Sequence, residues 1–220
     1  MKTNISVGVL GIQGDVEENK TATQEALDHS SVMGSAKFVR YAEDIENIDG
    51  IILPGGESTV ISTLATLHGE TLHTIRRRIA QGMPALGTCA GMIMLAKRAY
   101  DRVVGETKQQ LLSNLDIVVE RNAFGRQEDS FEAELSIPFL DKNNKTFRGV
   151  FIRAPVVTEV GADVDIIAKF NNRIVGVRQG NVIGTSFHPE LSGDDRIHTQ
   201  FIKIVLEYKR KIIAQQNQTT

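Results

Sequence analysis

The single cysteine of the chain, Cys89, lies at the centre of the pattern GTCAG at 87–91, between a predicted strand and a predicted helix. Small residues two positions before and after a nucleophile let a strand turn sharply into a helix, so that the side chain stands clear at the carboxyl edge of a sheet. The positive end of the following helix favours the thiolate, which is the form that attacks carbonyl carbon. The alternative is a small buried apolar residue, which is the commoner case for an intracellular cysteine. The flanking glycines favour the nucleophile.

A thiolate nucleophile needs a proton shuttle, and His188 is the histidine best placed to supply one. It follows the apolar run 182–187, precedes Pro189 and has Glu190 two positions later. Residues i and i+2 of an extended segment point the same way, so Glu190 can orient the imidazole and favour its charged form. A strand-end histidine capped by a neighbouring acid is a serious rival for this segment alone. The other four histidines are predicted to lie on solvated helical faces, and their spacing is not typical of metal ligands. They are His29, His68, His73 and His198.

The third candidate segment is a glycine turn, LPGGES at 53–58, that follows a predicted strand and leads into a predicted helix. Backbone N–H groups exposed by paired glycines can bind an oxyanion, and the loss of one such donor typically costs roughly 10²- to 10³-fold in rate. The lysine of a P-loop is absent, so this is not a phosphate loop of that kind. Gly8, Gly11 and Gly14 likewise do not give the dinucleotide-binding fingerprint. Alone, a Gly-Gly pair after a strand is more often just a turn.

A sheet must hold these three segments, and the first half of the chain has the alternation of strands and helices that builds one. The predicted strands cover 5–10, 36–40, 50–53 and 84–88, and the predicted helices cover 15–29, 58–67, 70–81 and 91–99. The continuous apolar run GIIL at 50–53 suits a strand that is buried on both faces. The pattern predicts an α/β fold of three layers, with a central mixed, mostly parallel sheet flanked by helices.

After about residue 115 the pattern changes to short runs separated by turn residues, which favours antiparallel pairing. These runs cover 115–121, 130–136, 148–152, 164–170, 173–178 and 182–186. Asn171-Asn172 and Gly180-Asn181 lie where tight hairpins need residues that tolerate positive φ. From Asp194 onward, apolar residues recur at three-to-four spacing and predict a terminal helix whose last residues, 215–220, fray. With no linker or internal repeat, residues 1–220 are predicted to form one domain.

The composition limits the classes of function. The 25 basic side chains are nearly balanced by 27 acidic ones, which argues against general electrostatic binding to nucleic acid or to an anionic membrane. The apolar runs are shorter than the roughly 18 residues that span a bilayer, and we expect neither a membrane span nor a signal peptide. A single cysteine excludes an intrachain disulfide and favours the cytoplasm. We expect no metal or other cofactor and no nucleic-acid or membrane partner.

Three motifs in register, PGGEST at 54–59, GTCAG at 87–91 and SFHPE at 186–190, resemble those of the class I (triad) glutamine amidotransferases. The resemblance is closer still to one branch, the glutaminase subunits of pyridoxal phosphate synthase. The segments that look like the signatures of this branch are RNAFGRQ at 121–127, DSFEA at 129–133 and FIRAP at 151–155. The resemblance runs from Gly8 to Leu191 and implies the flavodoxin-like α/β fold of the class.

The resemblance implies a glutamine amide hydrolase in which Cys89 attacks the side-chain carboxamide, His188 protonates the departing ammonia and Glu190 orients His188. Water then releases glutamate from the thioester. The N–H groups of Gly56 and Ala90 are implied as the oxyanion hole, and Ala90 directly follows the nucleophile as the elbow geometry requires. The implied substrate-binding residues are Gly55, Gly56, Glu57, Ser58, Arg121, Ile152 and Arg153.

Composition alone favours surface solvation for Arg121 and Arg153, although a guanidinium suits the carboxylate of an amino acid. The resemblance further implies that the ammonia passes to a separate synthase subunit, so the expected partners are L-glutamine and that subunit in a hetero-oligomeric complex. Docking activates such glutaminases, and Gln13 lies in the segment involved. At Glu18-Asn19 the chain departs from the Glu-His that relatives commonly carry.

Two rival functions stay open at this point. One is a triad glutaminase that serves another synthase, and the other is a non-catalytic regulatory module that kept the fold. The segments at 121–127 and 151–155 favour the pyridoxal phosphate pathway over the first rival. The intact set of Cys89, His188 and Glu190 argues against the second.

Overall fold

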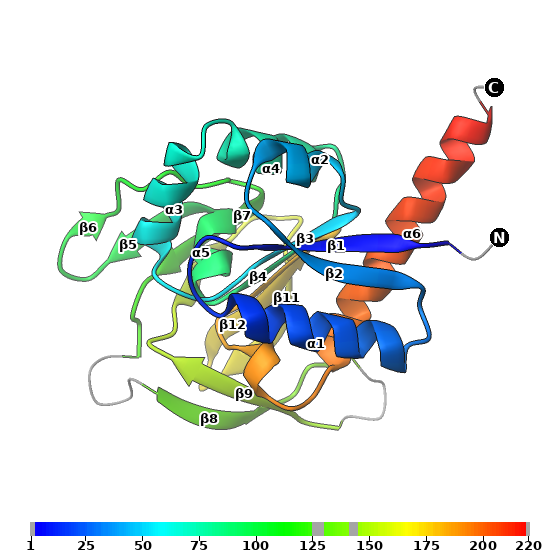
Figure 1. Cartoon of the computed structure of the whole chain (residues 1–220). Helices are drawn as coiled ribbons and strands as arrows, with labels where there is room; N and C mark the ends of the chain where they lie inside the picture. Colours follow the sequence, from blue (N-terminus) through cyan, green and yellow to red (C-terminus); the bar gives the residue numbers. More distant parts are fainter. Residues whose placement is uncertain (1–2, 125–129, 141–144, 219–220) are drawn as a thin grey trace.

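The centre of the fold is a mixed sheet of eleven strands in the computed structural model, which describes residues 3–124, 130–140 and 145–218 (Figure 1). One half of this sheet is parallel, with the order β2–β1–β3–β4–β13. The bounds are Ile5–Leu10 (β1), Gly34–Val39 (β2), Gly50–Leu53 (β3), Ala85–Thr88 (β4) and Val182–Thr185 (β13). The carboxyl ends of parallel strands meet at one edge, so the segments that follow β1, β3, β4 and β13 are brought together there.

The other half of the sheet continues from β13 through β12, β10, β7, β5 and β6, with β11 paired to β12. These strands pair antiparallel, except that β7 and β5 are parallel. Their bounds are Ala96–Asp101 (β5), Gly105–Glu106 (β6), Leu115–Glu120 (β7), Val156–Val160 (β10), Asp165–Phe170 (β11) and Arg173–Gln179 (β12). A separate antiparallel pair consists of β8 (Ser130–Leu135) and β9 (Phe147–Ile152).

Both faces of the parallel half are covered. One face packs on α2 (Ala42–Glu46), α3 (Ser58–Leu67), α4 (Thr71–Ala80) and α5 (Ala90–Leu95), and the other packs on α1 (Val16–His29), α6 (Arg196–Gln218) and the β8–β9 pair. In Figure 1, α2 and α4 lie above the strands and α1 lies below them. Successive residues of β3 enter opposite cores, because Ile51 and Leu53 belong to one apolar cluster and Ile52 to the other. The predicted three-layer α/β fold is confirmed.

The structure differs from the sequence prediction at the helix expected over 91–99. α5 ends at Leu95, and the chain continues directly as β5, which pairs with β7. Alanine, lysine and arginine favour helices locally, but pairing with a neighbouring strand overrides that weak preference. The expected antiparallel pairing of 182–186 is also only half right, since β13 pairs antiparallel with β12 and parallel with β4. The structure also contains three elements that the sequence pattern does not predict, α2, β6 and β10.

The two expected hairpin turns are confirmed. Asn171 and Asn172 have φ values of 47° and 63° between β11 and β12, and Gly180 has a φ of 57° between β12 and β13. α6 continues to Gln218, and residues 219–220 lie outside the described residues, so fraying of the C-terminal end stays a prediction. The organisation of residues 1–220 as one domain also stays a prediction. Across the described ranges we find no helix that is long and apolar enough to cross a membrane.

Candidate active site

Cys89 occupies a sharp bend between β4 and α5. Its backbone has φ 49° and ψ −103°, a conformation that costs a non-glycine residue about 1–3 kcal/mol and is held by the surrounding structure. The Cys89 N–H donates to the carbonyl of Thr185 at 2.7 Å, which ties the bend to the end of β13. A Cβ atom on Gly91 would lie 1.8 Å from the Leu53 carbonyl oxygen, so only glycine lets α5 pass this close to β3. The bend thus has the features of the predicted nucleophile elbow.

His188 and Glu190 follow β13 at the same edge of the sheet. The His188 N–H donates to the carbonyl of Val150 at 2.8 Å, and a short 3-10 turn, Pro189–Leu191, places Glu190 beside the ring. Nδ1 of His188 hydrogen-bonds with Glu190 Oε1 at 2.9 Å. Nε2 is buried and makes no hydrogen bond within the described part of the chain. The second ring nitrogen is therefore available for a proton shared with Cys89 or a substrate.

The charge on His188 is set by burial and by three neighbouring groups. Burial opposes the charged form, but Asp15, Cys89 and Glu190 outweigh it and raise the pKa of His188 to about 12. Burial also raises the pKa of Glu190, against the effect of the adjacent imidazolium. Candidate ligand atoms of Asp15, His188 and Glu190 lie within 4.8 Å of one another, and the expected lack of a metal stays a prediction. The arrangement favours an imidazolium at neutral pH.

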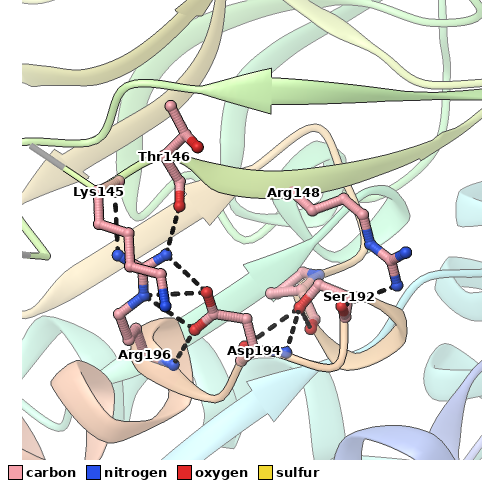
Figure 2. A network of polar contacts seen from close by, with 7 residues as sticks. Lys145, Thr146, Arg148, Ser192, Asp194 and Arg196 are labelled. Carbon is pink, nitrogen blue, oxygen red and sulfur yellow. Dashed lines mark hydrogen bonds and ion pairs between the residues drawn. The ribbon is translucent and has the colours of Figure 1, made fainter.

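A polar network anchors the turn that carries His188 and Glu190 (Figure 2). The Ser192 hydroxyl donates to the carbonyl of Pro189 at 2.7 Å, and the Ser192 carbonyl accepts from Arg148 in β9 at 2.9 Å. Arg196, the first residue of α6, donates from Nε to both carboxylate oxygens of Asp194 at 2.9 Å. These contacts connect the turn to a strand and a helix, which limits the positions that the imidazole can take.

The glycine turn after β3 is held by the loop that follows β1. The Glu57 N–H donates to Gln13 Oε1 at 2.9 Å, and the Glu57 carboxylate caps α3 by accepting from the N–H groups of Thr59 and Val60. Ser58 donates through its hydroxyl to Gln109 Oε1 at 3.2 Å. On the other side of the turn, the carbonyl of Gly55 accepts from the Asp15 N–H at 3.2 Å, so the predicted oxyanion donor Gly56 lies between two fixed residues, Gly55 and Glu57.

An acidic and a basic side chain face each other beside this turn. Arg121 follows β7 and donates from Nη2 to Glu57 Oε1 at 2.8 Å and from Nη1 to the Thr59 hydroxyl at 3.1 Å. Burial tends to raise the pKa of Glu57, but the N–H groups of Val60 and Thr59 and the charge of Arg121 lower it overall. Glu57 is therefore ionised, and the pair presents both signs of charge.

A cavity of about 250 Å³ brings the predicted residues together. Those that line it are Cys89, His188, Gly56, Glu57, Ser58, Arg121, Ile152 and Arg153. The cavity is smaller than the roughly 300–1,000 Å³ of drug-sized ligand pockets, which suits a small polar substrate. Gly55, Ala90 and the Glu190 side chain are buried behind the lining. The Cys89 thiol donates to the carbonyl of Ile152 at 3.8 Å, so β9 closes over the nucleophile.

Sequence reasoning missed three residues that line the cavity, Asp15, Ile93 and Asn122. Asp15 was interpreted only as the start of a helix, although its position after β1 at the carboxyl edge of the sheet is a usable signal. Asn122 has a φ of 50° in the segment 121–127, of which residues 125–127 lie outside the described residues.

His198 corrects another expectation. It was assigned to a solvated face, but it is fully buried in α6, because it lies on the same apolar stripe as Phe201 and Val205. Burial lowers its pKa to about 4, and both of its ring nitrogens lack hydrogen-bond partners within the described ranges. It lies outside the cavity lining and is a core residue.

Known proteins resemble this chain in sequence and in structure. The model of the SNO glutamine amidotransferase family matches residues 9–207. A pyridoxal 5′-phosphate synthase subunit PdxT from Nitrosopumilus maritimus is 44% identical over 93% of this chain and 98% of its own, and one from Pyrococcus furiosus is 48% identical over 92% and 100%. A crystal structure of a glutamine amidotransferase, 42% identical, matches 90% of this chain and 98% of its own with a TM-score of 0.78.

Proposed function

Because this chain belongs to the SNO glutamine amidotransferase family, we propose that it hydrolyses L-glutamine to L-glutamate and ammonia as the glutaminase subunit of a pyridoxal 5′-phosphate synthase. The observation that carries the proposal is the cavity in which Cys89, at a strained bend, shares a lining with His188 and with the Glu57–Arg121 pair. A nucleophile, a proton carrier and two opposite charges are what an amino-acid amidohydrolase needs.

The charged pair suits the two ends of an amino acid. Arg121 offers a planar guanidinium to the α-carboxylate of glutamine, and Glu57 offers an ionised carboxylate to its α-ammonium. The two groups form an ion pair at 2.8 Å, which orients both charges beside the cavity. Bound in this way, the side-chain carboxamide of glutamine extends toward Cys89.

Acylation begins when the Cys89 thiolate, whose proton is held by the His188 imidazolium, attacks the carboxamide carbon, and a C–S bond forms as the carbonyl oxygen becomes negative. The N–H groups of Gly56 and Ala90 stabilise that oxyanion, at a typical value of roughly 10²- to 10³-fold in rate per donor. His188, charged because of its neighbours, gives its Nε2 proton to the amide nitrogen. The C–N bond then breaks, and ammonia leaves a thioester on Cys89.

Deacylation uses the same imidazole in the opposite direction. Now neutral, His188 takes a proton from a water molecule, whose oxygen attacks the thioester carbon. The C–S bond breaks and glutamate leaves, so one glutamine and one water give one glutamate and one ammonia. Glu190 keeps Nδ1 as the protonated nitrogen through both steps, because its carboxylate accepts from it.

The fate of ammonia completes the proposal. The named relatives are subunits of a pyridoxal 5′-phosphate synthase. We infer that this chain binds the ammonia-consuming synthase subunit in a hetero-oligomeric complex. The single, unpaired Cys89 supports a cytoplasmic location, where thiols stay reduced.

The test compares the complete synthase complex built with the wild-type chain and with Cys89→Ala or His188→Asn. Each variant should lower glutamine-dependent formation of glutamate and pyridoxal 5′-phosphate by at least about 10⁴-fold. Complex formation should be unchanged, and added ammonium chloride should restore pyridoxal 5′-phosphate synthesis. His73→Asn is the matched control, because that histidine is exposed on α4.

Two outcomes contradict the proposal. Near-normal glutamine hydrolysis by Cys89→Ala or His188→Asn would remove those residues from the reaction. A wild-type chain that hydrolyses glutamine but does not support pyridoxal 5′-phosphate synthesis with the synthase subunit would assign the glutaminase to a different acceptor.

A further inference from the structure

A second carboxylate lies on the catalytic imidazole. Oδ2 of Asp15 is 3.0 Å from Nδ1 of His188, the same nitrogen that Glu190 Oε1 contacts at 2.9 Å. The His188 side chain is 4% exposed and that of Asp15 is 34% exposed, so Asp15 approaches the ring from the cavity and Glu190 from the interior. The triad of sequence motifs does not include this contact, because Asp15 is more than 170 positions away from His188.

Asp15 does not perform the task that its position in the sequence suggests. It is the residue before the first turn of α1, where an aspartate commonly caps the helix by accepting backbone N–H bonds. Its side chain makes no such capping bond, and Glu17 and Glu18 supply the negative charge of the first helical turn. The carboxylate points to His188 instead, so the start of α1 lacks the stabilisation that a side-chain cap usually provides.

The backbone around Asp15 is arranged to hold this contact. The Asp15 N–H donates to the carbonyl of Gly55 at 3.2 Å, and Asn19 donates from its side chain to the carbonyl of Asp15 at 2.9 Å. A Cβ atom on Gly55 would lie 2.3 Å from Cε1 of His188 and 2.7 Å from Oδ2 of Asp15. Glycine at 55 therefore leaves the space in which carboxylate and ring meet.

Two anions on one nitrogen have a defined chemical effect. Nδ1 carries one hydrogen, and Asp15 and Glu190 both favour the ring with that hydrogen in place. Among the described residues, the titratable groups with the largest effect on the His188 charge are Asp15, Cys89 and Glu190. Asp15 and Glu190 thus hold Nε2 as the nitrogen that exchanges a proton with Cys89 and the substrate, and they stabilise the imidazolium.

We propose that Asp15 is a positioning residue for His188. Its side chain acts as a second carboxylate on Nδ1 of His188, beside that of Glu190. The inference rests on the proposed function, because His188 is there the proton carrier. Asp15 also belongs to the loop that holds the glycine turn through Gln13, so one segment positions both the base and the candidate oxyanion donor.

The first arm of the test measures kinetics in the complete complex with Asp15→Asn, Glu190→Gln and the double variant. Asp15→Asn should lower kcat about 10- to 100-fold with little change in KM, as groups that orient a reacting residue commonly do. The double variant should lose more than the product of the two single losses, because each carboxylate partly replaces the other. Glu18→Gln is the matched control, since it removes the same charge from an exposed residue of the same turn.

The second arm does not depend on activity. NMR titration of the imidazole signals of the full chain, with the His188 signal assigned by its loss in His188→Asn, reports the charge of the ring directly. Because one anion is gone, His188 in Asp15→Asn should lose its proton at a lower pH than in the wild type, and Glu18→Gln should cause no such shift. Asp15→Ser, which suits a helix start, replaces Asp15→Asn if the latter does not fold.

The outcomes are separable. If the wild-type complex does not hydrolyse glutamine, the proposed function fails, and the titration still decides whether Asp15 acts on His188. If Asp15→Asn matches Glu18→Gln in kcat and in the His188 titration, the positioning role of Asp15 is wrong. A fall in kcat with an unchanged titration also overturns it, because the effect then does not pass through the imidazole.

Discussion

The two halves of the central sheet contribute different things to the cavity. The parallel half supplies the proposed reacting groups from the ends of its strands, with the glycine turn after β3, Cys89 after β4 and His188 after β13. The antiparallel half supplies Arg121 after β7, and the separate β8–β9 pair supplies Ile152 and Arg153. The proposed reacting groups therefore lie on closely packed main chain. The remaining lining residues reach the cavity from its rim through their side chains.

Burial and backbone geometry express the same contrast. His188 and Cys89 are 3% and 6% exposed, and the bend at Cys89 leaves no room for a Cβ atom at Gly91. Arg153 is exposed, and Ile152 is 37% exposed. In the proposed reaction, catalysis thus depends on groups held by steric constraint, and substrate recognition depends on charge. Substitutions in the parallel half should therefore have larger effects than those at the rim.

The largest effect is expected at Gly91. A Cβ atom there would lie 1.8 Å from the carbonyl oxygen of Leu53, so Gly91→Ala must separate α5 from β3 and move Cys89. We expect a loss of stability of about 3 kcal/mol or more, from overpacking and strain, together with loss of glutamine hydrolysis. Urea unfolding and glutaminase assays measure both, with Gly11→Ala as a control, because a Cβ atom there would lie at an ordinary contact distance of 3.5 Å from its nearest neighbour. A variant of near wild-type stability and activity would contradict the steric account of the bend.

Local patterns predicted the parallel half well, because each element there is specified by its own sequence. The apolar run of β3 and the glycines around Cys89 indicate a buried strand and a sharp turn without knowledge of their partners. By contrast, the helix expected over 91–99 was wrong, because pairing of β5 with β7 is a long-range effect. The parallel contact of β13 with β4 was missed for the same reason.

The candidate site divides in the same way. His188 and Glu190 could be paired from a spacing of two residues, and the structure gives a contact of 2.9 Å. Asp15 could not be paired with His188 from spacing, because the contact joins two distant strand ends and the local pattern favours a helix cap. Burial of His198 follows from its phase on α6, because its spacing from Phe201 and Val205 places it on the apolar stripe of the helix.

His198 extends the contrast to stability, because α6 packs beneath the parallel strands. Its pKa is lowered from 6.5 to about 4 by burial, so between these pH values the unfolded chain binds a proton that the native chain does not. Stability from this group is therefore complete above about pH 6.5 and falls by about 3 kcal/mol as the pH drops toward 4.

Urea unfolding at several pH values checks this expectation with His198→Phe, which cannot take up a proton. The free energy of unfolding of the variant, relative to that of the wild type, should increase as the pH falls from 7 to about 4. His73→Phe serves as a control because its side chain is 68% exposed. Parallel pH curves for the wild type and His198→Phe would mean that His198 is not the source of acid sensitivity in this core.

Arg121 gives the smallest expected effect and the clearest test of the rim. Arg121→Gln removes the charge-assisted bond that we propose to the substrate carboxylate. It also leaves Glu57 without its cation, although the N–H groups of Thr59 and Val60 still hold the Glu57 carboxylate. The variant should raise KM about 10- to 100-fold with a small change in kcat, since a group that binds substrate and transition state equally affects KM alone.

Arg98→Gln is the control, because Arg98 belongs to the same half of the sheet and pairs with Glu159 outside the cavity. A fall in kcat as large as that for Cys89→Ala would place Arg121 among the reacting groups, and the division between a constrained reaction edge and a charged rim would then be wrong.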